Sequence, residues 1–187
     1  MDETNKILHI TTDNKFIQRA YDMFEYAFPG KNYVIMLQNK ISGHNLFENI
    51  DNIEYINLFD LLNPLFIRKL TNYDFVILHS LIPSWINLVN KSSADIKFVW
   101  IGWGYDYYDL IVDSKDDLLL PETKTLVHDM KNNDSIKKQI ASLIKWPAKK
   151  LLFDNNKVKA ISKIKAFSPV LYEDYLCLLY TSDAADE

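Results

Sequence analysis

The residues best suited to chemistry in this chain follow a short apolar run near its middle. The run 98–101 leads directly into the segment 102–108, which holds two glycines, three tyrosines and one acid. A carboxylate can accept the proton of a hydroxyl group, and aromatic rings can bind the apolar face of a saccharide. Glycines allow the backbone to approach a ligand closely. The segment therefore contains the residue types that hold and activate a saccharide hydroxyl.

Two interpretations of this segment follow from its chemistry. In the first, Asp106 activates or positions a hydroxyl, while Trp103, Tyr107 and Tyr108 form a saccharide platform beside Gly104. We then expect Asp106→Asn to lower turnover and to leave folding intact. In the second, the tryptophans belong to the core, the acid caps a helix and the glycines form a turn.

Polar residues also follow two other apolar runs. His79 and Ser80 stand at the end of the run 74–79, and His79 is a second candidate for hydroxyl activation. Asp13 follows the run 6–12 and is a third candidate, although an aspartate there also suits a helix N-cap. A lone histidine is more often a hydrogen-bonded structural residue than a base.

Some common sites are not predicted. The four histidines lack metal-ligand spacing, so we expect no metal site and no cofactor. The glycine patterns of dinucleotide-binding and phosphate-binding loops are also missing, which argues against a dehydrogenase or an NTPase.

The elements that would position these residues alternate between strand and helix. Apolar periodicity predicts helices over 16–27, 59–70 and 83–89. It predicts strands over 6–12, 33–37, 53–57, 74–79, 96–101 and 158–162. This alternation predicts an α/β fold with a Rossmann-like, doubly wound parallel sheet. Ligands of such sheets bind outside the carboxyl ends of the strands, which is where the candidate residues fall.

Composition narrows the class of protein. With 187 residues, of which 48% are hydrophobic and 25% charged, the chain can bury one sizeable core. Lys and Arg number 21 against 25 Asp and Glu, so the net charge of -4 argues against a nucleic-acid binder. No apolar run approaches the roughly 20 residues of a membrane span, and we expect a cytoplasmic protein.

A lysine-rich segment lies toward the C-terminus, with ten lysines between residues 131 and 165. Lys145, Lys149 and Lys150 surround Trp146, and this combination suits an anionic membrane surface or a diphosphate. An ordinary solvated helix face is the alternative. The final residues, 177–187, match the translation of a transposase adapter used in sequencing libraries. We therefore expect 177–187 to be a scar and the natural protein to continue beyond Leu176, unless this is a genuine polar tail.

One motif resembles a known family. Trp100, Trp103, Gly104, Asp106 and Tyr108 fit the W-x-x-W-G-x-D-x-Y signature of the bacterial 4-acetamido-4,6-dideoxygalactosyltransferases. These enzymes, of the 4-alpha-L-fucosyltransferase type, transfer TDP-linked N-acetylfucosamine to polyprenyl-diphosphate-linked saccharide, the lipid II of enterobacterial common antigen. The resemblance covers the N-terminal half of a two-domain GT-B glycosyltransferase. The family also has a strand-terminal histidine at the place of His79, which implies that Ser80 and Pro83 help to line the acceptor cleft.

The resemblance implies a division of the chain and a set of partners. Residues 1–165 would form the Rossmann-like acceptor-side domain, and 166–176 would begin a linker or a second domain. The partners implied are a TDP-sugar donor, a polyprenyl-diphosphate saccharide acceptor and the inner face of the bacterial inner membrane. The fragment alone would be inactive because it lacks the donor half. The alternative is a flavodoxin-like binding or regulatory module without catalysis.

Overall fold

The fold is an α/β structure built on one parallel sheet. The computed structural model describes residues 5–12, 17–38, 50, 53–110, 120–125, 155–169, 171–174 and 176. Within these residues, six strands form a sheet in the order β3-β2-β1-β4-β5-β6, and all neighbouring pairs are parallel. The strands are β1 (Ile7–Thr12), β2 (Asn32–Leu37), β3 (Ile53–Ile56), β4 (Phe75–His79), β5 (Phe98–Ile101) and β6 (Ile164–Ser168). The predicted Rossmann-like sheet is confirmed, since this is the strand order of dinucleotide-binding folds.

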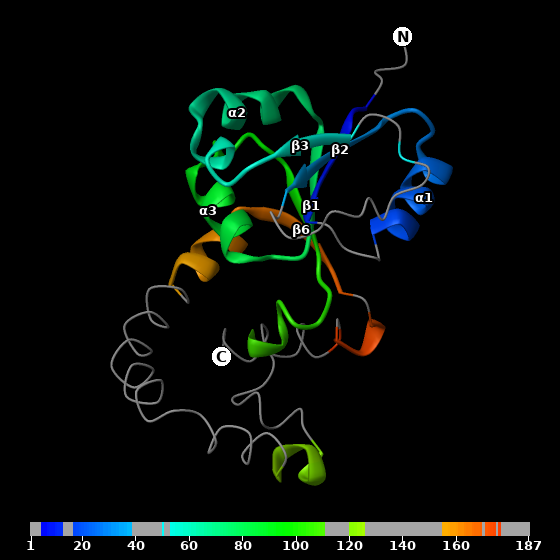
Figure 1. Cartoon of the computed structure of the whole chain (residues 1–187), viewed down its shortest axis with the longest axis vertical. Coiled ribbons are helices and arrows are strands. Elements are labelled where there is room, and N and C mark those ends of the chain that lie inside the picture. Colours follow the sequence, from blue (N-terminus) through cyan, green and yellow to red (C-terminus); the bar gives the residue numbers. More distant parts are fainter. Residues whose placement is uncertain are drawn as a thin grey trace.

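Helices cover both faces of the sheet, as Figure 1 shows. On one face lies α1 (Ile17–Ala27), whose Phe24 ring packs edge-on against His9 of β1 at a centroid distance of 4.7 Å. On the other lie α2 (Pro64–Lys69) and α3 (Pro83–Lys91), which bury their apolar residues in one cluster with Leu8 and Ile10. Because successive residues of a strand point to opposite faces, β1 supplies His9 to one side and Leu8 and Ile10 to the other.

Proline opens both helices of the second face. Pro64 and Pro83 occupy the first turn of α2 and α3, where a missing N–H costs nothing. The Asn63 side chain caps α2 by accepting a hydrogen bond from the Leu65 N–H at 2.9 Å. The helix predicted over 59–70 is thus divided into η1 (Asp60–Leu62), α2 and η2 (Leu70–Asn72).

The sixth strand lies later in the chain than predicted. The prediction of a strand over 158–162 is wrong, because residues 155–161 form a helix. Lys157 and Ala160 are both buried, and their separation is the helical one. The strand itself is β6, whose Phe167 ring packs on Trp100 at 4.3 Å. The sheet therefore extends through Ser168, past the boundary expected at residue 165.

Lys163 joins the segment before β6 to the C-terminal end of α3. The Lys163 ammonium donates hydrogen bonds to the carbonyls of Asn90 at 2.9 Å and Ser92 at 3.0 Å. These carbonyls end α3, where the helix leaves acceptors without partners and favours positive charge. Lys163 thus satisfies the end of α3 and fixes the turn that leads into β6.

Gly102 fits its place because two aromatic rings leave no room for a side chain. A Cβ atom built there would lie 2.5 Å from Cδ1 of Tyr107 and 2.8 Å from Cε2 of Phe167. Both rings also pack against Trp100. The glycine after β5 therefore serves close packing of the chain on itself.

We predict that Gly102→Ala lowers the free energy of unfolding by about 1–3 kcal/mol, the usual cost of overpacking a tight site. Urea denaturation followed by tryptophan fluorescence measures this change. Gly30→Ala is the control, since nothing lies within 4 Å of its Cβ position and only the φ of +68° opposes the substitution. Equal stability of Gly102→Ala and the parent protein would contradict the packing argument.

Candidate functional site

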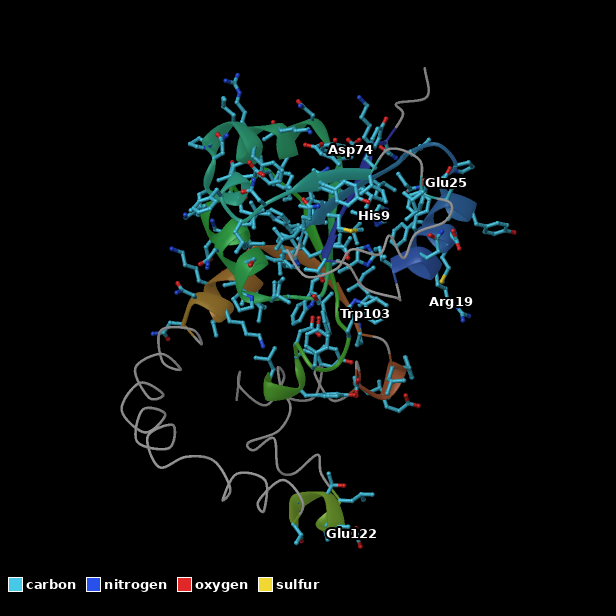
Figure 2. The ribbon with its side chains drawn as sticks, viewed as in Figure 1. His9, Arg19, Glu25, Asp74, Trp103 and Glu122 are labelled. Atoms are coloured by element: carbon cyan, nitrogen blue, oxygen red, sulfur yellow. The ribbon has the colours of Figure 1, made fainter. Side chains whose placement is uncertain are left out.

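The candidate site lies where the strand order reverses. The chain runs outward from β1 through β2 to β3, then returns to place β4 on the other side of β1. Parallel sheets open a crevice at such a point, outside the carboxyl ends of the strands. His79 ends β4 at this edge. Trp103, labelled in Figure 2, lies just beyond the end of β5. The geometry thus brings two of the predicted residues to one edge.

Two histidines are in direct contact beneath this edge. Nδ1 of His9 lies 3.0 Å from Nε2 of His79, and the rings are stacked with centroids 5.2 Å apart. Nε2 of His9 lies 3.2 Å from Oδ1 of Asn32, at the start of β2. Both histidines are buried, with 0% and 4% of their surface exposed. A chain of polar contacts therefore crosses three neighbouring strands.

Burial keeps both rings neutral. Loss of solvation lowers the pKa of His9 from 6.5 to about 4, although the contact with Asn32 and the negative charge of Glu25 oppose the shift. The pKa of His79 falls to about 3, first through burial and then through repulsion from His9. Neither ring carries a charge at neutral pH, so each offers one donor and one acceptor nitrogen.

Asn32 connects the histidines to a carboxylate on α1. Its Nδ2 donates to Oε2 of Glu25 and to the carbonyl of Phe28, each at 2.8 Å. Oε1 of Glu25 accepts the N–H of Gly30 at 2.5 Å, just after the helix ends. The Gly30 and Asn32 hydrogen bonds lower the pKa of Glu25, so the carboxylate is charged. Figure 2 shows Glu25 and His9 on the α1 side of the sheet.

We predict that the protein loses stability as pH falls from 7 to 5. The unfolded chain binds protons on both histidines near pH 6.5, whereas the native rings resist protonation until pH values near 4 and 3. Each histidine then removes roughly 1–2 kcal/mol of unfolding free energy at pH 5. Urea titrations at several pH values measure this loss. The double variant His9→Asn/His79→Gln lacks both titrating rings and should show a shallower slope; an unchanged slope would exclude the pair as its source.

Asp106 is the centre of a second polar cluster. Its Oδ2 accepts hydrogen bonds from the Leu81 N–H at 2.7 Å and from Nε1 of Trp100 at 2.8 Å. Its Oδ1 accepts the Trp103 N–H at 2.8 Å. The residue is buried, with 6% of its surface exposed. The carboxylate thus connects the exits of β4 and β5, and its use as a base stays a prediction.

The exit of β4 is strained and held from two sides. Ser80 has a φ of +74°, a region that non-glycine residues rarely adopt. Its N–H donates to the carbonyl of Ile101 at 2.9 Å, and the next N–H, of Leu81, is bound by Asp106. Backbone strain of this kind persists where surrounding contacts determine it. Asp106 therefore helps to fix the backbone that carries His79.

We predict that Asp106→Asn destabilises the fold, contrary to the expectation from sequence that folding stays intact. Both carboxylate oxygens of Asp106 accept hydrogen bonds. An asparagine amide has only one acceptor oxygen, so at least one buried donor would face its NH2 group instead. Each buried donor left unsatisfied costs about 1–3 kcal/mol. Urea denaturation measures the loss, and Asp95→Asn at an exposed position is the matched control. Equal midpoints for the two variants would show that Asp106 has no structural role.

The tyrosines of the motif have different surroundings. Tyr107 has no exposed surface, and its ring packs against Trp100, Tyr108 and Phe167. Its hydroxyl bonds to the carboxylate of Asp174. The ring therefore has no free face, which corrects its assignment to the saccharide platform.

Two other platform residues stay candidates. Tyr108 is half-buried, and burial followed by the charge of Asp174 raises the pKa of its phenol. Trp103 is half-buried as well. Gly104, with a φ of +87°, supplies the carbonyl that accepts the N–H groups of Tyr107 and Tyr108. The turn thus keeps two aromatic residues at the edge of the sheet.

Several predicted residues lie outside the described part of the chain. These are Asp13 and the group proposed for membrane or diphosphate contact, Lys145, Trp146, Lys149 and Lys150. Within the described residues, no group of three or more His, Cys, Asp and Glu side chains could hold a metal ion. No helix among the described residues has the length and apolar character needed to cross a membrane.

Sequence reasoning missed three members of the histidine chain. His9, Asn32 and Glu25 are not among the residues that the sequence singles out. A polar ring inside the otherwise apolar run 7–10 was the available signal, since buried polar groups require partners. The partners themselves depend on which strands are neighbours and on their register.

Comparisons with known proteins give little further information. No protein-family model and no curated protein match the chain. Among solved structures, it is similar to the apo form of the NADPH-dependent glyoxylate/hydroxypyruvate reductase of Sinorhizobium meliloti, with 16% identity and a TM-score of 0.32. The similarity covers 57% of this chain and 54% of that chain, so this chain spans about half the length of the reductase. A similarity of this extent leaves the activity of this chain open.

Proposed function

We propose that this chain is the acceptor-side part of a GT-B glycosyltransferase. It would transfer an acetamido-dideoxy sugar such as N-acetylfucosamine from a TDP-sugar to a polyprenyl-diphosphate-linked saccharide. The motif resemblance supports the family, and the described sheet is compatible with it. The observation that carries the proposal is the placement of His79 at the strand-order reversal, with Nδ1 lacking a hydrogen-bond partner among the described residues.

The buried Nδ1 of His79 is suited to a ligand hydroxyl. Buried polar atoms in folded proteins nearly always have partners, and this orphan belongs to the last residue of β4, where ligands of parallel sheets bind. A neutral imidazole keeps this lone pair free at physiological pH, and a hydroxyl could donate to it.

The reaction would proceed by displacement at the anomeric carbon. The acceptor oxygen forms a bond to this carbon, while the bond from the carbon to the nucleoside diphosphate breaks. The diphosphate leaves with the bonding electron pair and takes the hydroxyl proton, while Nδ1 of His79 accepts the hydrogen bond that orients the hydroxyl. Because burial holds the pKa of His79 near 3, this nitrogen positions the hydroxyl and does not store its proton.

Asp106 would act on this reaction through the backbone. Its hydrogen bonds to the Leu81 and Trp103 amides hold the two loops that follow β4 and β5. Trp103 and Tyr108 would then form what remains of the predicted saccharide platform. We assign Asp106 a positioning role and His79 the contact with the acceptor.

The test is transfer of sugar by the full-length protein. We expect product with TDP-N-acetylfucosamine and a polyprenyl-diphosphate disaccharide, detected by mass spectrometry. His79→Gln should lower kcat/KM by about 10²-fold, because glutamine keeps the contact made by Nε2 but removes the acceptor at Nδ1.

Lys124→Ala, at an exposed position, is the control variant and should retain parental activity. A folded His79→Gln protein with undiminished transfer would remove His79 from the mechanism. A complete absence of transfer, with binding of small ligands retained, would favour the flavodoxin-like module.

A further inference from the structure

We infer that Glu25, Asn32 and His9 form a positioning relay that sets the tautomer of His79, so that its Nδ1 presents a lone pair to the acceptor. The role toward the acceptor rests on the proposed function. The tautomer itself follows from the contacts alone. None of the three relay residues belongs to the motif that resembles a known family.

The relay begins with the orientation of the Asn32 amide. Glu25 and the carbonyl of Phe28 offer only acceptor atoms, and both lie 2.8 Å from one atom of the amide. That atom must therefore be the NH2 nitrogen. The oxygen of Asn32 is consequently the atom that faces His9.

Each later contact has one possible direction. Oδ1 of Asn32 accepts, so the proton of the neutral His9 ring lies on Nε2. Nδ1 of His9 is then an acceptor, and its contact at 3.0 Å requires a proton on Nε2 of His79. A neutral His79 ring has one proton, so Nδ1 carries a lone pair. This is the atom without a partner among the described residues.

Further contacts hold Glu25 and His9 of the relay in place. The second oxygen of Glu25 is held by the Gly30 N–H, which fixes the carboxylate at the end of α1. The rings of Tyr21 and Phe24 on α1 pack edge-on against His9. The opposite tautomer of His79 would place two lone pairs against each other at the His9 contact. The relay thus excludes the form of His79 that could not accept a hydrogen bond at Nδ1.

Nitrogen NMR of the full-length protein with labelled histidine tests the tautomer without any substrate. We expect bare Nδ1 and protonated Nε2 signals for both His9 and His79, assigned by loss of each set in His9→Leu and His79→Gln. In Asn32→Leu and His9→Leu, His79 should show averaged signals of two tautomers. His9→Asn should restore the single form, since the asparagine oxygen can accept from Nε2 of His79.

Measurements of kcat and KM distinguish a positioning role of the relay from a purely structural role. In folded His9→Leu and Asn32→Leu, we expect kcat to fall at least about tenfold with little change in KM, as when the group that orients a catalytic histidine is lost. His9→Asn should recover most of kcat. A proton on Nδ1 of His79 in the parent protein would overturn the relay, whatever the enzyme transfers. The expected tautomer in a protein without transferase activity would instead overturn the proposed function and leave the tautomer assignment standing.

Discussion

The carboxylate of Asp106 is the contact on which the carboxyl edge of the sheet depends. Two loops leave β4 and β5 side by side, and their amides would otherwise be buried without acceptors. One side chain accepts from both loops and from the indole of Trp100. These hydrogen bonds hold the strained backbone at Ser80 and therefore the position of His79 just before it. They also hold the chain next to the turn that starts at Gly104. A carboxylate is required because an amide offers only one acceptor oxygen.

The two faces of the sheet have different physical characters. The face toward α2 and α3 is apolar and holds large side chains such as Trp85 and Phe98. The face toward α1 contains His9 and His79, whose burial is compensated by hydrogen bonds to each other and to Asn32. Polar contacts have strict geometry, whereas apolar packing tolerates more variation. The face toward α2 and α3 therefore contributes mainly apolar burial. The face toward α1 contributes hydrogen bonds that fix the orientation of the two histidine rings.

The fold could be predicted from sequence because apolar periodicity is a local property. Runs such as 74–79 and 83–89 correspond closely to β4 and α3. The sixth strand was misplaced because the segment 158–162 is short and holds only three apolar residues, and such a pattern fits a strand or a helix equally well. His79 could be chosen from its position at a strand end. The contacts of His9 and Asn32 could not, since they depend on which strands are neighbours and on a register that only tertiary structure supplies.

The long connection between β5 and β6 has a consequence for how this domain folds and diverges. Ile101 and Ile164 lie in adjacent strands, yet the whole segment 102–163 separates them in the chain. The entropy of closing a loop grows only with the logarithm of its length, about 0.6 kcal/mol per doubling. Insertions and deletions between the turn 102–108 and Lys163 can accumulate over evolution at little thermodynamic cost, provided that Asp106, Lys163 and Phe167 keep their contacts. Contacts so distant in sequence form slowly, so we expect β6 to join an already assembled five-stranded sheet late in folding.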